Sequence, residues 1–364
     1  MDERRVQSID AGTLEDLAVG ATVLGTGGGG DPYLGKLMAR QAIEEHGPVR
    51  LVGPEELPAG GLVLPVAMMG APTVLVEKIP NGGELQKVVR AVESRLGREA
   101  AALMCVEAGG INSTIPIVAA AELELPLLDA DGMGRAFPEI PQCSMSVRGV
   151  SATPMALADE KGNLGLIETV DNDWTERLSR TATVAMGGSS IIALYPMSVE
   201  EAPTAVIPET MSRAVEIGGT IRAARARGED ALEALLDLAS GRLLFRGKVV
   251  DVLRRTVEGF ARGTARIEGL GNDAGSSLEL EFQNEHLVAL RDGEPVASVP
   301  DLITVLDADA RTPVTTEGIV YGQRVEVVGL PCAPIWREPE ALKVVGPGYF
   351  GYPFGYSPLE EVRT

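Results

Sequence analysis

The first half of the chain alternates short apolar runs with segments whose apolar residues recur at helical spacing. Apolar runs occupy residues 49–52, 61–69, 100–109 and 126–131. Helical spacing marks residues 13–25, 31–46, 83–96 and 113–124. Apolar runs that lack period-two alternation and are separated by helices are typical of buried strands in a layered α/β fold. We therefore predict that residues 1–167 form an α/β domain with helices on a mixed or parallel sheet.

The pattern changes twice in the second half. Residues 172–186 and 209–239 keep helical spacing, whereas from about residue 242 the pattern predicts strands joined by tight turns, such as the turn at residues 291–293. Aromatic residues are concentrated between Tyr349 and Tyr356, and because a disordered tail would be poor in them, we expect this segment to pack against the fold. We predict that residues 168–364 form a helical segment, a smaller β-rich domain and this aromatic C-terminal segment. The chain would then be α+β overall.

Charge narrows the classes of partner. The 364 residues carry a net charge of −20, which argues against nucleic acid and anionic membranes because both are bound through Lys and Arg patches. No uninterrupted apolar run is long enough to cross a bilayer, and the first residues lack the apolar core of a secretory signal. We expect a cytoplasmic homo-oligomer that binds neither nucleic acid nor membrane.

Few residues of the chain suit metal-thiolate or histidine chemistry. The three cysteines are far apart and form no Cys-x-x-Cys pair, which argues against a disulfide framework and a thiolate zinc site. The two histidines are His46, at a polar helix end, and His286, in a predicted hairpin. Acid and base groups are therefore expected to be carboxylates, or Lys, Tyr or Cys.

Four consecutive glycines follow the first helical segment. From Gly25 the sequence spells Gly-x-Gly-x-x-Gly, but a dinucleotide-binding loop of this kind follows a strand, and here the preceding pattern is helical. Consecutive glycines allow positive φ and leave N–H groups bare, so they can form an anion-binding nest at a helix start. The alternative is a purely structural turn. We predict that ligand contacts come from Gly27, Gly28, Gly29, Gly30 and Asp31.

A carboxylate follows one of the buried runs. Glu107 comes directly after the run, and Asn112 and Ser113 stand at the next helix start. Ligands of open α/β sheets bind at the carboxyl ends of strands, where a carboxylate can have a raised pKa and act as a general base or acid. We predict that Glu107 is catalytic and that Asn112 and Ser113 bind substrate, although these two could merely cap the helix. Cys105 could be a nucleophile or a small buried thiol.

Residues 127–142 place four charged residues on one loop. The loop begins like a calcium-binding EF-hand but lacks its later ligands. An aspartate pair can share a proton or bind a hard cation, and arginine can hold a carboxylate or imide oxygen. We predict that Asp129 and Asp131 are catalytic and that Arg135 and Glu139 bind substrate, unless the charges of the loop only pair with one another. A divalent metal, if bound, would take Asp129, Asp131 and Glu139 as ligands.

Four segments carry a resemblance to a known family. They are LGTGGGGDPYLG (24–35), EAGGINSTIP (107–116), LLDADGMGRAFPE (127–139) and GPGYFGYPFGYSP (346–358). In this order and spacing the chain resembles the S-methyl-thiohydantoin desulfurases over nearly its whole length. That family is often encoded beside hydantoinase/oxoprolinase-type subunits. One departure is Pro353, where we expect an acidic residue.

The resemblance implies an α/β N-terminal domain, a smaller β-rich C-terminal domain and a small hydantoin-like substrate. The implied reaction is hydrolytic: water replaces the S-methyl group and methanethiol leaves. Glu107 or one of the two aspartates would deprotonate the water, while Arg135 and the glycine N–H groups would hold the ring carbonyl. No cofactor is required, although a divalent metal stays open.

Two rival hypotheses belong to other classes. The first is a non-catalytic or accessory subunit of a hydantoinase/oxoprolinase-type enzyme, for which such a protein would be the partner. The second is a nucleotide-dependent enzyme, which would be stabilised against heat by its nucleotide.

Overall fold

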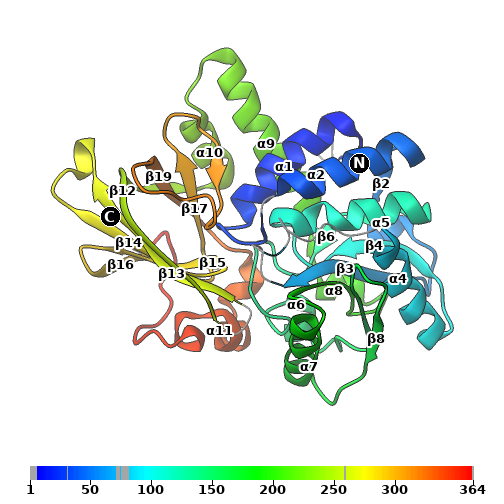
Figure 1. Cartoon of the computed structure of the whole chain (residues 1–364). Coiled ribbons are helices and arrows are strands. Elements are labelled where there is room, and N and C mark those ends of the chain that lie inside the picture. The colour runs from blue at the N-terminus through cyan, green and yellow to red at the C-terminus, as the bar shows by residue number, and fades with distance from the viewer. Residues whose placement is uncertain (1–5, 31, 71–73, 75–81, 258–259, 363–364) are drawn as a thin grey trace.

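The computed structural model describes residues 6–30, 32–70, 74, 82–257 and 260–362 (Figure 1). Its described strands form two large sheets, the first from strands between residues 8 and 198 and the second from strands between residues 242 and 330, and a two-stranded ribbon. The first sheet has nine strands, β10 pairing beside β3 and the rest in the order β1-β2-β5-β4-β3-β9-β7-β8. Its strands are β1 Ser8–Ile9, β2 Val49–Val52, β3 Leu62–Gly70, β4 Ala100–Cys105, β5 Leu127–Leu128, β7 Met155–Ala158, β8 Leu164–Ile167, β9 Ser189–Ala193 and β10 Met197–Ser198.

The first sheet is mixed. Strands β2, β5, β4 and β3 run parallel to their neighbours within this group, whereas β9 pairs antiparallel with β3 and β7. Every residue of β3 except the last is buried, which explains its continuous apolar run. The small ribbon is made of β6 Ala130–Asp131 and β11 Ile207–Pro208.

Helices cover the first sheet on both sides. In Figure 1, α1, α2 and α5 lie above β3, and α6 and α7 lie below it. The side chain of Asp10 caps α1 by accepting the N–H groups of Gly12 and Thr13. The helices are α1 Ala11–Leu24, α2 Pro32–His46, α4 Gly83–Leu96, α5 Ile115–Leu123, α6 Ser144–Val147, α7 Asn172–Ala185, α8 Ala202–Ala205, α9 Thr210–Arg227, α10 Ala231–Ala239 and α11 Pro339–Val345.

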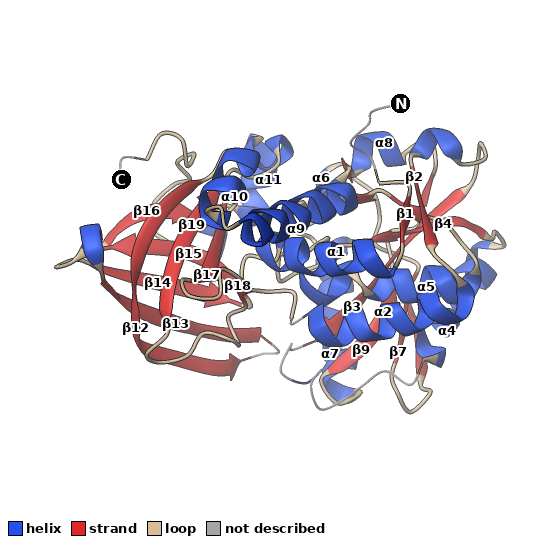
Figure 2. Cartoon of the chain, turned by 90° about the horizontal axis from the view of Figure 1, so that it is seen from above, coloured by secondary structure: helices blue, strands red, loops and turns tan. Residues whose placement is uncertain are grey.

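The second sheet is antiparallel and has the order β16-β15-β14-β13-β12-β19-β17-β18. It stands at the opposite end of the molecule from α4 and α5 (Figure 2). Its strands are β12 Arg242–Val257, β13 Phe260–Gly269, β14 Ser277–Gln283, β15 Glu285–Arg291, β16 Glu294–Ser298, β17 Leu302–Asp307, β18 Pro313–Val314 and β19 Arg324–Leu330. The predicted class, an α/β part followed by a smaller β-rich part, is therefore confirmed.

The part of the chain between the predicted boundary at residues 167/168 and strand β12 packs with the first sheet. Strand β9 lies in the first sheet although it follows the predicted boundary between residues 167 and 168. Helix α9 packs closely on α1, because a Cβ on Gly20 would lie 1.8 Å from the carbonyl oxygen of Ala214, and one on Gly218 would lie 1.9 Å from that of Asp16. The second sheet thus begins only with β12, and the boundary at 167/168 does not separate the sheets.

The two parts share one apolar core. The main buried cluster contains residues of the first sheet together with Leu287, Val288 and Val328 of the second. A smaller cluster, which includes Phe245, fills the other face of the second sheet. In the C-terminal segment, Phe350 and Tyr352 pack on the main cluster, as the aromatic content predicts. No described helix is both long and apolar enough to cross a bilayer.

Candidate active site

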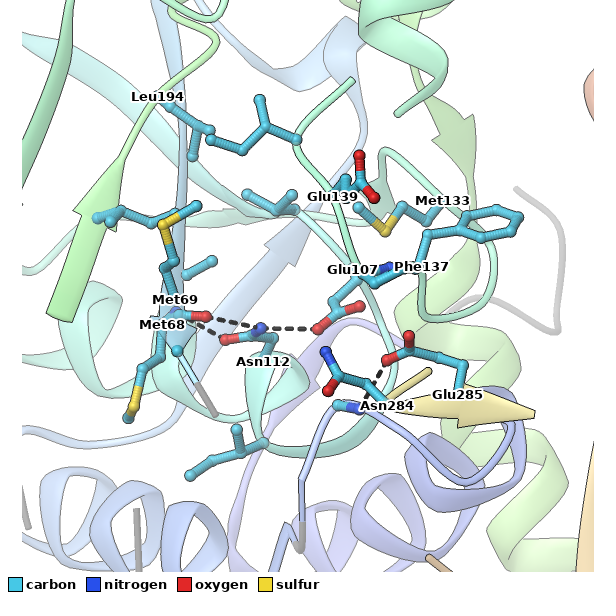
Figure 3. Close-up of a pocket in the computed structure, with 18 of the residues that line it drawn as sticks. Met68, Met69, Glu107, Asn112, Met133, Phe137, Glu139, Leu194, Asn284 and Glu285 are labelled. Atoms are coloured by element: carbon cyan, nitrogen blue, oxygen red, sulfur yellow. Dashed lines mark hydrogen bonds between the residues drawn. The ribbon is translucent and has the colours of Figure 1, made fainter. Parts of the chain in front are cut away.

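A cavity of about 690 Å³, counted with the part open to solvent, lies where the two parts of the chain meet (Figure 3). The ends of β3 and β4 form one side, and the turn between β14 and β15 forms another. Its walls contain Gly29, Ala67, Met68, Met69, Gly70, Val106, Glu107, Ile111, Asn112, Met133, Phe137, Pro138, Glu139, Ile140, Arg180, Ile192, Leu194, Asn284 and Glu285. Ligand sites of α/β sheets occupy this position, at the carboxyl ends of strands.

Glu107 enters this cavity just after β4. The side chain is 6% exposed, and its Oε1 accepts a hydrogen bond of 2.7 Å from Asn112 Nδ2. The other oxygen, Oε2, has no hydrogen-bond partner among the described residues. Burial raises the pKa of Glu107 from 4.5 to about 8, against the lowering effect of the Asn112 hydrogen bond. A carboxyl group with these properties can exchange a proton near neutral pH.

Asn112 fixes the orientation of Glu107. It lies in a single 3₁₀ turn, Gly110–Ser113, between β4 and α5. Its Oδ1 accepts the N–H of Met68 at 2.7 Å, and its Nδ2 donates to the Met68 carbonyl at 3.2 Å as well as to Glu107. Ser113 does not line the cavity, and its hydroxyl donates to the Gly110 carbonyl inside the same turn. Asn112 thus lines the cavity, but its amide already binds protein groups.

The glycine loop follows helix α1, which agrees with the helical pattern before it and leaves it without the strand of a dinucleotide-binding loop. A Cβ on Gly28 would lie 2.0 Å from Glu285 Oε1, and one on Gly27 would lie 2.4 Å from the His286 ring. Gly29 lines the cavity and donates its N–H to Glu285 Oε1 at 3.3 Å. The glycines are therefore required for close approach of β15 to the loop.

The other residues of the glycine loop contribute little to the cavity wall. The Gly28 N–H donates to the Gly25 carbonyl at 2.8 Å, so it is not a bare donor. Gly30 has a φ of 77° and does not line the cavity. Asp31 lies outside the described residues. Of the four glycines that are predicted to contact a ligand, Gly29 is the one that lines the cavity.

Glu285 is a cavity residue that the sequence does not reveal. It begins β15 after Asn284, whose φ of 58° makes the tight turn from β14. The side chain is 2% exposed, and its Oε2 has no partner among the described residues. Burial raises the pKa of Glu285 well above its ordinary value, and the negative charge of Glu107 raises it further. An acidic residue in a hairpin carries no sequence signal, because such residues are common on exposed turns.

The two aspartates of the 127–142 loop hold other parts of the chain. Asp131 accepts the N–H groups of Ala108 at 2.7 Å and of Gly134 at 2.8 Å. Asp129 accepts the backbone N–H and the hydroxyl of Ser212 at the start of α9. Neither residue lines the cavity. Their geometry supports structural roles, although burial raises the pKa of Asp131 to about 7.

Arg135 is fully buried and joins the two halves of the chain. Its Nη1 donates to the carbonyls of Pro300 and Asp301 at 2.9 and 2.8 Å, and its Nη2 donates to the Thr26 hydroxyl at 2.9 Å. Its Nε donates to the Ala136 carbonyl at 3.0 Å. All three guanidinium nitrogens thus donate to protein groups. Arg135 does not line the cavity, so the structure does not place it where it would bind substrate.

Glu139, which is predicted to bind substrate, lines the cavity. Its Oε2 accepts a hydrogen bond of 2.7 Å from the Tyr349 hydroxyl, which brings the C-terminal aromatic segment to this wall. Burial raises the pKa of Glu139. Arg180, which the sequence does not single out, lies on the same wall, forms an ion pair with Glu176 and donates to the Pro138 carbonyl.

The remaining candidate side chains do not reach the cavity wall. Cys105 is fully buried, and burial raises the pKa of its thiol far above the ordinary value, which disfavours a thiolate. His286 is also fully buried, and burial lowers its pKa to about 4, so the ring is neutral. Within the described residues, no three His, Cys, Asp or Glu side chains gather as metal ligands would. The predicted metal set of Asp129, Asp131 and Glu139 is not brought together there.

Fold and site together define an α+β protein with a cavity between its two parts and two buried carboxyl groups in that cavity. The sequence model of the S-Me-THD-like N-terminal domain matches residues 12–169, and that of the S-Me-THD-like C-terminal domain matches residues 170–359. The chain belongs to the S-Me-THD-like family, in agreement with the resemblance to S-methyl-thiohydantoin desulfurases.

A solved structure is similar over nearly the whole chain. It is the crystal structure of a protein from Chromobacterium violaceum, 25% identical, with a TM-score of 0.79 over 97% of this chain and 100% of the other. No curated protein matches this sequence. The family is consistent with a hydantoin-related role and with an enzyme-related function.

Proposed function

We propose that the protein is a hydrolase that replaces the S-methyl group of a small S-methyl-thiohydantoin with water, using Glu107 as the general base. The observation that carries the proposal is the Glu107 carboxyl group, which is buried at the end of β4, oriented by Asn112 and supplied with one unpartnered oxygen in the cavity. Membership of the S-Me-THD-like family supports the choice of substrate.

The cavity walls suit such a substrate. Met68, Met69 and Met133 provide soft apolar surface, and thioether side chains pack well around an irregular methylthio group. Glu107 and the Gly29 loop provide polar groups for a ring that has both nitrogen and oxygen. In Figure 3, Glu107 faces Met68 and Met69, and Met133 lies on the same side of the cavity as Glu107. A site with an apolar wall and a few oriented polar groups is typical of small-molecule binding.

The reaction begins with a water molecule next to Glu107 Oε2. Glu107 takes a proton from this water while the oxygen bonds to the ring carbon that carries sulfur. The carbon–nitrogen π pair moves to the ring nitrogen, which gains the second proton of the water as the ring oxygen becomes a carbonyl. The carbon–sulfur bond then breaks, and methanethiolate leaves with the proton that Glu107 took. Hydrolysis at this carbon needs no redox cofactor. Metal analysis of the protein as purified tests whether a divalent metal is bound.

The test is an assay of the purified protein alone with a 5-substituted S-methyl-thiohydantoin in ¹⁸O-labelled water. We expect release of methanethiol and one labelled oxygen in the hydantoin product. Glu107→Gln should lower turnover by about 10²–10⁴-fold, the usual contribution of a general base. The matched control is Glu294→Gln, which changes an exposed carboxylate at the start of β16 and should leave the rate unchanged.

Two outcomes would overturn the proposal. Wild-type rates in Glu107→Gln would remove this residue from the mechanism. Absence of methanethiol with the pure protein, followed by its appearance when a hydantoinase-type partner is added, would favour the accessory-subunit hypothesis.

A further inference from the structure

Two carboxyl groups from distant parts of the chain meet in the cavity. Glu107 comes from the end of β4 in the first sheet, and Glu285 comes from the start of β15 in the second. Figure 3 shows both side chains directed into the same space. They are 6% and 2% exposed, so both are almost completely withdrawn from bulk water.

Each carboxyl group uses one oxygen and leaves the other unpartnered. Oε1 of Glu107 accepts from Asn112, and Oε1 of Glu285 accepts from the Gly29 N–H. Oε2 of both residues has no hydrogen-bond partner among the described residues. Two buried negative charges in one cavity would be strongly unfavourable, whereas one proton held by the pair removes a charge and supplies a donor.

We propose that Glu107 and Glu285 share a single proton and act together as the base and the acid of one catalytic site. The assignment of Glu285 rests on the proposed hydrolysis, because it gives the reaction the proton donor that Glu107 alone does not provide. It also explains why the site lies between the two parts of the chain, since each part supplies one of the two groups.

The surroundings decide which member holds the proton. Burial raises the pKa of both residues, to about 8 for Glu107 and well above its ordinary value for Glu285, where the negative charge of Glu107 adds to the effect. A hydrogen bond to a carboxyl oxygen favours the ionised form, and the bond from Asn112 to Glu107, at 2.7 Å, is shorter than the bond from Gly29 to Glu285, at 3.3 Å. Glu107 therefore ionises first and Glu285 keeps the proton. The other charged groups that act on the pair or share its cavity are Asp131, Arg135, Glu139 and Arg180.

Each proton can be followed through one complete reaction. Water bonds to the ring carbon and gives its proton to the Glu107 carboxylate, while the carbon–nitrogen π pair moves to the ring nitrogen, which takes the proton of Glu285. The hydroxyl of this intermediate then gives its proton to the Glu285 carboxylate as the carbonyl forms. The carbon–sulfur bond breaks, and methanethiolate takes the proton from Glu107. Both residues return to their starting states.

The pair can be tested without substrate. Isotope-edited infrared spectra of glutamate-labelled protein, recorded as a function of pH, report the protonation of each carboxyl group through wild-type-minus-variant differences. We expect two titration steps separated by more than about two pH units in the wild type, and one intermediate step in Glu107→Gln and in Glu285→Gln. If the wild-type titration equals the sum of the two single-variant titrations, the carboxyl groups are independent and the proposal is wrong.

A second variant covers the case in which Glu285→Gln does not fold. Glu285→Asp keeps the charge but moves it away from Glu107, so the two steps should approach each other. An unchanged separation would also contradict the pair. Because these titrations need no substrate, a wild type that releases no methanethiol would refute the proposed hydrolysis while leaving the shared proton measurable.

The pH dependence of activity distinguishes the base from the acid. With an active wild type, the plot of kcat/KM against pH should be bell-shaped, since one group must be ionised and the other protonated. Glu107→Gln should lose the rising limb and Glu285→Gln the falling limb. A falling limb that persists in Glu285→Gln would exclude this residue as the acid.

Discussion

The Asn112 side chain donates to Glu107 Oε1 at 2.7 Å while it pairs with both backbone groups of Met68. One amide thereby links the end of β3 to the carboxyl group at the end of β4. We expect Asn112→Ala to raise the pKa of Glu107, because the variant loses a donor that favours the carboxylate. The rising limb of the activity profile should move to higher pH.

The same substitution also leaves two backbone groups of Met68 unpaired. The free energy of unfolding should fall by about 1–3 kcal/mol, which chemical denaturation would measure. A stability loss of this size without a shift of the activity profile would mean that Asn112 acts only on the fold.

At pH values above 4.5, the ordinary pKa of a glutamate, Glu107 should destabilise the folded protein. The fold raises this pKa from 4.5 to about 8, so the neutral form is favoured and the free energy of unfolding declines between these two pH values. Relative to wild type, Glu107→Gln should gain stability with rising pH in this window, by about 1.4 kcal/mol per pH unit, and no more above pH 8. Thermal unfolding at pH 5, 6.5 and 8 measures the difference, and a constant difference would argue against the raised pKa.

A side chain at Gly28 is expected to push the Glu285 carboxyl group away, because a Cβ would lie 2.0 Å from Glu285 Oε1. Gly28→Ala should therefore displace the Glu285 carboxyl group, abolish the falling limb of the activity profile and cost about 1–3 kcal/mol of stability. Gly348→Ala is the matched control, since a Cβ there meets no atom within 4 Å. Equal activity of the two variants would show that the position of Glu285 does not matter.

Arg135 is expected to stabilise the fold rather than bind substrate. Arg135→Met would leave several buried acceptors without their donor, among them the carbonyls of Pro300 and Asp301. We expect a loss of about 3–5 kcal/mol in the free energy of unfolding, as for removal of one partner from a buried charged network. A variant that keeps wild-type stability but has a much higher KM would restore the role of a substrate clamp.

Much of the fold could be predicted because its signals are local. The apolar run at β3 and the glycine-rich turn after α1 depend on residues close in sequence. The position of β9 could not be predicted in the same way, because its pairing with β3 joins segments far apart in the chain.

The candidate site was predictable in part for the same reason. Glu107 and Asn112 follow a buried strand, and the carboxyl end of a strand is a known place for ligands. Asp131 and Arg135 also belong to a charged segment that follows an apolar run. Their side chains nevertheless form hydrogen bonds with backbone groups of the fold. Sequence alone does not distinguish a charged side chain that faces a cavity from one that satisfies buried N–H or carbonyl groups.

The sequence by itself determined several helices and buried strands of the first part, the two-part α+β architecture, the family and the carboxylate at the end of β4. Only the tertiary structure decided that Glu285 joins Glu107 and that the glycines make room for it. The physical reason is that periodicity and turn propensity act over a few residues, whereas the burial and pKa of a carboxyl group depend on every segment that folds around it.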